Sequence, residues 1–233
     1  MQKFVVGLAI LAVTSAAAMG ATQIVQSQNY SGIPDYQRIL TFNQFDDQGG
    51  ALQLTSVEVA ICLTANGGAL RVDNDAEDPA SGAIEFGAQI LVSSSVSMVD
   101  ALFNPIFAAG DLKATGGTSL SLGPDDGDAD VGGTPNFSWV GDDFGEYIGG
   151  AELADDSGIV NSLVYGQYTG LGTYTITLDA VQVASYGSLG GVQALIDPLD
   201  TCGTVTVTYT YVPEPATLSL LALGGLALLR RRR

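Results

Sequence analysis

The 233-residue chain has 25 acidic residues against 8 lysines and arginines, contains no histidine, and carries a formal net charge of −17. Such a charge repels phosphate backbones, so we expect no nucleic-acid partner. It also suits a protein that is exported and must stay soluble. Without histidine the chain cannot use Ser-His or Cys-His nucleophile activation, the usual general base, or zinc ligation by imidazole.

Residues 1–20 have the composition of a secretory signal peptide. Lys3 provides a positive start, residues 4–13 are almost entirely apolar, and Ala16, Ala17 and Ala18 offer small residues for cleavage. The run is too short to span a bilayer permanently. We therefore predict a signal-peptide helix that is removed after Ala18 or Gly20, with an N-terminal core helix as the alternative.

The segment from residue 21 to residue 211 is predicted to form one all-β domain. Its first long strand covers residues 52–63, where apolar side chains occupy alternate positions, as expected of a half-buried strand. The alternation slips at Thr55 and Ser56. A slip of this kind turns the apolar set to the other face unless an extra residue absorbs it, so we expect a β-bulge there.

Alternation continues further along the chain. Residues 84–92 form a second run, residues 174–183 a third with a slip predicted near Asp179 and Ala180, and residues 204–211 alternate threonine with valine or tyrosine. Shorter candidate strands cover residues 23–28, 37–42, 119–122, 137–140 and 159–165. Residues 189–196, before Pro198, are predicted to form one short helix.

Glycine pairs separate these strands and predict turns. The strands do not alternate with helical segments, which disfavours a parallel sheet. We therefore predict an antiparallel β-sandwich with jelly-roll or Greek-key connections.

The segment 212–233 has three parts. Pro213, Glu214 and Pro215 interrupt the preceding strand, residues 216–229 carry no charge, and four arginines follow (Arg230, Arg231, Arg232 and Arg233). Fourteen helical residues reach about 21 Å against a hydrocarbon core of about 30 Å, so this short transmembrane helix needs snorkelling arginines to insert. Clustered arginines stay on the cytoplasmic side and place the domain outside.

This tripartite tail resembles the PEP-CTERM sorting signal of Gram-negative bacteria. The resemblance implies processing at or near Pro213, Glu214 and Pro215 by an exosortase, a membrane transpeptidase. It further implies transient anchoring in the inner membrane, followed by location at the cell surface or in the extracellular matrix. Proteins with this signal commonly accompany exopolysaccharide and biofilm loci. A plain C-terminal anchor is the alternative.

Three segments of the central region, residues 40–46, 54–59 and 203–211, are similar to the choice-of-anchor E domain, as is the shorter stretch 144–149. In that family an extracellular β-rich domain is joined to different surface anchors. The resemblance implies a fold and a location for residues 21–211, and it supplies no catalytic residues.

Two acidic segments are candidates for a calcium site. Asp126, Asp128 and Asp130 in one segment, and Asp73 and Asp75 in the other, place carboxylates at alternate positions, and calcium prefers such oxygen ligands. Neither segment has the glycine and glutamate positions of an EF-hand. We therefore favour a pair of solvated acidic loops without a metal, with calcium as the alternative, and no other cofactor is expected.

The only cysteines, Cys62 and Cys202, are predicted to form a disulfide, because an exported compartment permits one. Strand phase turns both away from the apolar face, so a bridge between neighbouring strands is possible. The alternative is two unrelated small residues.

Two classes of function remain open. The first is a structural or adhesive component of the envelope or biofilm matrix, and extracellular polysaccharide is then a possible partner. The second is a carbohydrate-binding module that uses aromatic residues, which otherwise belong to the core (Phe137, Trp139, Tyr147, Tyr165 and Tyr168). A carboxylate-dependent glycoside hydrolase ranks third, because it needs two carboxylates facing each other in a deep cleft. We expect no enzyme.

Overall fold

The computed structural model describes residues 21–127, 141–187 and 189–213. Within them the chain forms antiparallel strands and a short 3₁₀ helix, so the predicted all-β class is confirmed. The elements in chain order are β1 (Thr22–Gly32), β2 (Tyr36–Asn43), β3 (Leu52–Asn66), β4 (Ala69–Asn74), β5 (Ala80–Ser94), β6 (Lys113–Leu122), β7 (Phe144–Ile148), β8 (Ala151–Ile159), η1 (Ser162–Gln167), β9 (Thr173–Ser185), β10 (Val192–Asp197) and β11 (Asp200–Pro213).

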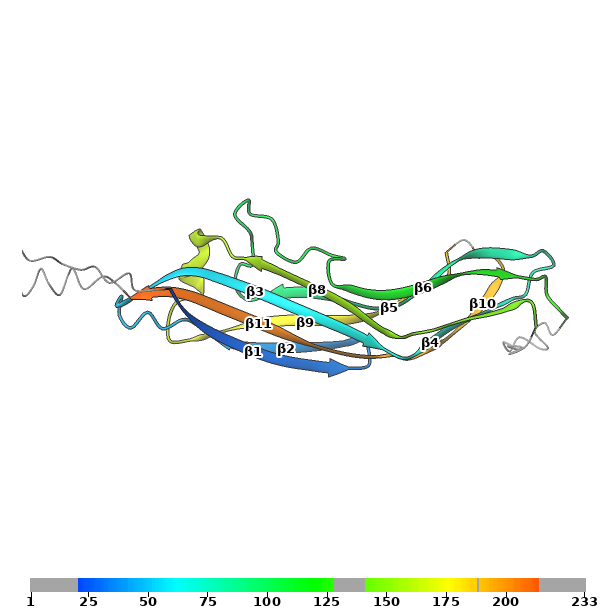
Figure 1. Ribbon diagram of the computed structural model, residues 1–233, viewed down its shortest axis with the longest axis horizontal. Coiled ribbons are helices and arrows are strands. Elements are labelled where there is room, and N and C mark those ends of the chain that lie inside the picture. The colour runs from blue at the N-terminus through cyan, green and yellow to red at the C-terminus, as the bar shows by residue number, and fades with distance from the viewer. Residues whose placement is uncertain (1–20, 128–140, 188, 214–233) are drawn as a thin grey trace, which may run out of the picture.

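The strands make three sheets with the orders β1-β11-β3-β8, β2-β9-β5-β6 and β10-β4-β7. The first two sheets contribute their apolar faces to one buried core, which makes the body a sandwich. Figure 1 shows an elongated molecule whose strands run mainly along its long axis. β4 and β6 reach one end of the molecule, and β11 finishes at the other.

The buried face of each long strand follows the predicted alternation. In β3 the side chains of Val57, Val59, Ile61 and Leu63 are buried, while the residues between them point outward. The same pattern holds along residues 84–90 of β5 and residues 205–209 of β11. Apolar residues at every second position therefore fix which face of each strand meets the core.

The predicted β-bulge is confirmed in β3. Ser56 lies opposite Thr210 and Leu54 lies opposite Tyr211, so Thr55 is the extra residue between two successive partners. Its hydroxyl donates a hydrogen bond to the carbonyl oxygen of Thr210 at 2.9 Å. The bulge keeps Leu54 and Val57 on the same side of the sheet despite the slip in sequence.

Two local predictions are wrong. The helix expected over residues 189–196 does not form, because Val192–Asp197 is strand β10 and pairs with β4 along its whole length. The slip expected at Asp179 and Ala180 is also wrong, because the pairing of β9 with β5 continues there without a shift. Ala180 stays in the core, while Val181 lies on the opposite face.

The predicted strand over residues 159–165 is wrong as well. β8 ends at Ile159, and the chain then turns into η1, where the side chain of Asn161 accepts a hydrogen bond from the backbone N–H of Leu163 at 3.0 Å. Asparagine at such a position replaces a missing backbone acceptor and favours the start of a helical turn. The candidate strand over residues 137–140 lies outside the described residues.

The edges of the first two sheets meet where β1 lies beside β2. Gln26 of β1 donates to the carbonyl oxygen of Asn43 and accepts from its backbone N–H, both at 2.9 Å. Gln28 of β1 donates to the carbonyl oxygen of Thr41. These two glutamine side chains take the place of a neighbouring strand along part of the β2 edge.

The two targeting segments, residues 1–20 and the tail from Glu214 to Arg233, lie outside the described residues. Among the residues that are described, no helix is both long enough and apolar enough to cross a membrane. β11 continues through Val212 and ends at Pro213, two residues past the predicted domain end at residue 211.

Candidate functional site

β4 and β6 reach the end of the molecule opposite the end of β11 (Figure 1), and the segments that adjoin β4, β6 and β7 are rich in aspartate. We call this region the acidic pole; it comprises Asp73, Asp75, Asp125, Asp126, Asp142 and Asp143. Its residues come from the end of β4, from the chain that follows β6 and from the chain that leads into β7. Three segments that are far apart in sequence thus contribute carboxylates to one region.

Hydrogen bonds hold these segments against one another. Asn74, which is 1% exposed, donates through its side-chain amide to the carbonyl oxygen of Gly123 at 2.6 Å and to that of Asp78 at 3.0 Å. The backbone N–H of Asp125 donates to the carbonyl oxygen of Ala76 at 2.9 Å. The two acidic segments singled out in the sequence therefore do lie side by side.

Asp125, Asp126 and Asp143 form the tightest group of carboxylates at the acidic pole. One oxygen from each lies within 4.8 Å of the other two. Asp143 is 1% exposed, and its Oδ2 accepts a hydrogen bond from the backbone N–H of Asp126 at 3.0 Å. Its Oδ1 is buried and has no hydrogen-bond partner among the described residues. Such a set of oxygens could ligate a hard cation.

The sequence identified only part of this group. Asp126 belongs to it, whereas Asp73 and Asp75 do not, and Asp128 and Asp130 lie outside the described residues. The favoured interpretation of solvated loops is wrong for Asp73, which lies in β4 and is 1% exposed. Asp143 was missed because it follows Asp126 by 17 residues, so no local spacing connects the two.

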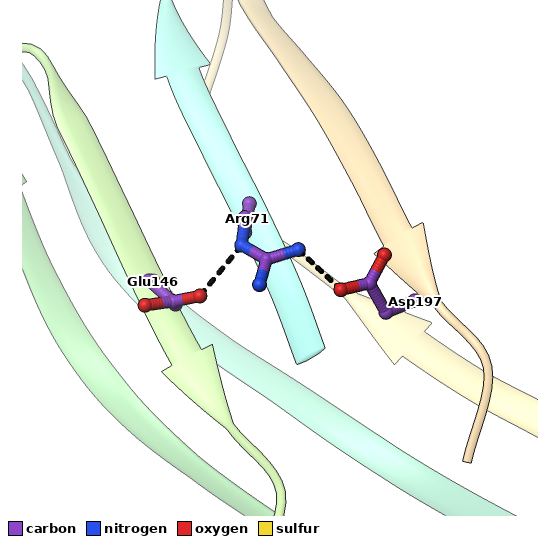
Figure 2. A network of polar contacts seen from close by, with 3 residues as sticks. All are labelled: Arg71, Glu146 and Asp197. Atoms are coloured by element: carbon purple, nitrogen blue, oxygen red, sulfur yellow. Dashed lines mark hydrogen bonds and ion pairs between the residues drawn. The ribbon is translucent and has the colours of Figure 1, made fainter. Parts of the chain in front are cut away.

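A second charged group crosses the three-stranded sheet beside the acidic pole (Figure 2). Arg71 of the central strand β4 donates through Nε to Glu146 of β7 at 2.6 Å and through Nη1 to Asp197 of β10. Hydrogen bonds to Asp197 and Glu146 raise the pKa of the guanidinium above its ordinary value. One cation thus joins both outer strands to the middle one.

Cys62 and Cys202 lie on the neighbouring strands β3 and β11, and both thiols are free and exposed. Cys62 is opposite Thr204 and Cys202 is opposite Thr64, so the two cysteines occupy diagonal positions on the outward face. Diagonal neighbours usually stand about 7–8 Å apart, more than the roughly 3.5–4.5 Å between the Cβ atoms of a disulfide. The predicted bond would need a local shift, and it stays a prediction.

Of the aromatic residues considered for sugar stacking, Tyr147, Tyr165 and Tyr168 lie within the described chain, and each is buried or half-buried. Tyr168 is fully buried and donates its hydroxyl to the carbonyl oxygen of Ser97 at 3.0 Å. Tyr147 donates to Glu152 at 2.9 Å across β7 and β8. Phe137 and Trp139 lie outside the described residues. An open depression beside Cys62 and Cys202 has no carboxylate among its lining residues, so it lacks the groups that glycoside hydrolysis requires.

Comparison with protein families finds the PEP-CTERM protein-sorting motif at residues 212–233. This match confirms the resemblance seen in the tail; the resemblance of the central region to the choice-of-anchor E domain is not confirmed. A search of curated proteins finds no match.

Structural comparison matches the chain to structures of infectious bursal disease virus. The Gt strain structure is 10% identical with a TM-score of 0.19, and the match covers 91% of this chain and 42% of that one. The Gx strain structure is 9% identical with a TM-score of 0.20, covering 92% and 49%. The chain thus spans less than half the length of these structures, and TM-scores this low do not show a shared fold.

The sorting motif begins where the fold ends. Val212 and Pro213 are the last two residues of β11, and they pair with Gln53 and Leu52 of β3. The motif implies processing by an exosortase-type enzyme. The structure and the motif together describe an exported β-sandwich protein that is transiently anchored in a membrane before processing.

Proposed function

We propose that this protein is a non-catalytic structural or adhesive component of the cell surface or extracellular matrix, delivered there by exosortase processing of its tail. The observation that carries the proposal is that the sorting motif begins within the last two residues of strand β11. No separate domain or linker stands between the sandwich and the processing signal in the sequence.

The attachment of the tail to the fold supports a display role. β11 lies between β1 and β3 and is paired on both sides from Thr201 to Tyr211, while Val212 and Pro213 pair with β3 alone. Pro213 lies opposite Leu52, and the next two motif residues, Glu214 and Pro215, reach at most about 7 Å beyond it at 3.3–3.6 Å per residue. The enzyme must therefore cut close to the folded body, and the released or attached end stays fixed to a central strand.

The surface charge supports a role outside the cell and disfavours binding to acidic polymers. Within the described residues the basic side chains are Arg38, Arg71 and Lys113. Arg71 and Lys113 are paired with carboxylates, and Arg38 lies 4.9 Å from the ring centre of Tyr36. An acidic surface with its few cations engaged repels acidic polysaccharides, so adhesion would use neutral sugars or a bridging cation.

Mass spectrometry of the C-terminus of the protein from intact cells tests the sorting step. We expect a terminus at or near Pro213 in the wild-type protein. A variant in which Arg230, Arg231, Arg232 and Arg233 are replaced by glutamine should keep its whole tail, because the charge that orients the short span is gone. A wild-type chain that retains Arg233 would show a plain anchor and contradict the proposal.

A glycan array tests the second half of the proposal. The structural role predicts no saturable binding to individual glycans. Saturable binding that is lost on Trp139→Ala would instead favour a carbohydrate-binding module, and hydrolysis of any glycan on the array would favour an enzyme.

A further inference from the structure

We propose that Asp125, Asp126 and Asp143 bind one calcium ion at the acidic pole. The three residues approach one another from the two sides of the segment 127–141, and an oxygen from each lies within 4.8 Å of the others. This inference does not depend on the sorting tail or on the proposed role at the cell surface.

Asp143 points to a ligand because its carboxylate is buried and only half satisfied. Oδ2 accepts from the backbone N–H of Asp126, whereas Oδ1 has no hydrogen-bond partner among the described residues. Burying a charged oxygen without a partner is costly, and native proteins avoid it unless an ion or water completes the site. A cation beside Oδ1 removes this cost.

Gly141 keeps open a space that the oxygens of Asp143 and Asp126 share. Its φ angle is +145°, a value that side-chain-bearing residues rarely adopt. The position that a Cβ atom would occupy on Gly141 has Oδ1 of Asp143 as its nearest neighbour, and Oδ2 of Asp126 lies 3.2 Å from it. The unsatisfied oxygen and a second carboxylate oxygen therefore border the same point.

Neither Asp125 nor Asp143 forms an ion pair with any described lysine or arginine. Arg71, the basic residue of the adjoining sheet, bridges Glu146 and Asp197. Carboxylates held this close repel one another unless they are protonated or share a cation.

Calcium fits these ligands better than other common ions. All three side chains offer hard oxygen atoms, which disfavours zinc and copper, since those metals prefer nitrogen and sulfur. Calcium accepts irregular arrangements of six to eight oxygens, including waters and backbone carbonyls, whereas magnesium requires a nearly regular octahedron. Sites in extracellular modules typically bind calcium with a Kd of about 10⁻⁴–10⁻³ M.

A bound ion would fasten the chain on both sides of residues 127–141. Asp125 is already joined to the end of β4 through Ala76, and Asn74 joins β4 to Gly123. An ion shared with Asp143 would connect these segments to the start of β7. We therefore expect calcium to stabilise the acidic pole and to raise the melting temperature.

Calorimetric titration and thermal unfolding of the full chain in detergent, after removal of divalent ions with a chelator, test the site. We expect saturable binding of one calcium ion per chain with a Kd of about 10⁻⁴–10⁻³ M, together with a rise in Tm. Asp143→Asn and Asp126→Asn should each weaken binding at least about tenfold, because each removes a charged ligand. Asp155→Asn is the matched control, since Asp155 is an exposed acid on β8.

Three results would overturn the proposal. The first is no binding heat and no change in Tm up to about 10 mM calcium, well above the expected Kd. The second is an equal response of wild type and Asp126→Asn, whose exposed position makes it tolerant even if Asp143→Asn fails to fold. The third is an equal rise in Tm with magnesium, which would indicate screening of a charged surface.

Discussion

The two ends of the molecule are held together by different interactions. At the end where β11 finishes, aromatic rings pack together: Phe42 lies 5.9 Å from Tyr174, and Phe45 lies 5.3 Å from Tyr211, measured between ring centres. At the acidic pole, Arg71 and Asn74 join strands and loops through polar contacts. We call the end where β11 finishes the aromatic end. Charged and polar contacts supplement the apolar core at the acidic pole, whereas ring packing dominates at the aromatic end.

The sorting tail is attached to the end of the sandwich that is packed with aromatic rings. The sorting motif begins in the last residues of β11, and buried aromatic area at this end provides stability that varies little with salt. The acidic pole lies at the opposite end of the molecule, where contacts between charged groups weaken as the salt concentration rises.

Removing the ring of Phe45 should have the largest effect at the aromatic end. Its side chain is 1% exposed, so Phe45→Ala should lower the free energy of unfolding by about 3–5 kcal/mol through lost burial and a cavity. Urea denaturation measures this change. Phe103, which is 59% exposed, provides the control, and Phe103→Ala should change stability by less than about 0.5 kcal/mol. Equal losses of unfolding free energy in Phe45→Ala and Phe103→Ala would mean that burial of Phe45 in the aromatic cluster does not stabilise the fold.

The hydroxyl of Tyr209 should contribute less to the free energy of unfolding than the ring of Phe45 does. It lies 2.8 Å from the hydroxyl of Tyr174 and donates to the carbonyl oxygen of Asn43 at 2.9 Å. Tyr209→Phe leaves the buried hydroxyl of Tyr174 without this partner and should lower the free energy of unfolding by about 1–3 kcal/mol. Tyr211→Phe is the control, because the Tyr211 hydroxyl has no hydrogen bond among the described residues.

Burial also makes the aromatic end sensitive to alkaline pH. It raises the pKa of Tyr209 to about 12 and raises the pKa of Tyr174 further. Because the folded-state pKa is raised, this stability is complete below the ordinary tyrosine pKa of about 10 and is lost as pH rises through the folded value. Ultraviolet titration should show these tyrosines ionising above that ordinary value, and Tyr209→Phe should remove part of the high-pH step.

Arg71→Met, in the sheet beside the acidic pole, should lower the free energy of unfolding by about 1 kcal/mol. The loss is small because the ion pairs are partly exposed and water screens them. The loss should shrink at high salt, whereas the loss in Phe45→Ala should not. Arg38→Met is the matched control, since Arg38 forms no ion pair with a described residue. Salt-independent destabilisation by Arg71→Met would show that packing, and not charge, holds this sheet.

Replacing Glu85 should have the smallest effect on the free energy of unfolding. A hydrogen bond from Lys113, and to a lesser extent one from Thr115, lowers the pKa of the Glu85 carboxyl below its ordinary value. Because the pKa is lowered on folding, its stabilisation is complete above the ordinary value of about 4.3 and is lost as pH falls through the folded value. Glu85→Gln should cost roughly 0.2–1 kcal/mol at neutral pH and almost nothing near pH 3, as urea denaturation at both pH values would show.

The strands with a regular apolar face could be predicted from the sequence. Residues 57–63, 84–90 and 205–209 alternate cleanly, and the bulge at Thr55 left a visible slip in that alternation. β8 left no such signal, since its inward positions hold Glu152, Ala154 and Asp156 while Leu153 is exposed. A strand with that pattern forms because β3 pairs with it, and the sequence of the strand alone does not reveal this.

The acidic pole could be predicted only in part for a similar reason. Local spacing identified two acidic segments, and the structure brings them together through Asn74. Asp143 joins them only because β7 pairs with β4 and carries the preceding residues to the same place. The predicted helix over residues 189–196 was wrong because the same sheet recruits β10, so long-range pairing outweighed the local preference.

The glutamines on β1 matter most when many copies of the protein are crowded together. An open strand edge invites the edge of another copy, and repeated addition leads to fibres or aggregates. Gln26 and Gln28 bond to the backbone of β2 at Asn43 and Thr41, so part of that edge has no free groups to offer. A dense layer of these sandwiches on an envelope could therefore remain a set of separate, individually folded units.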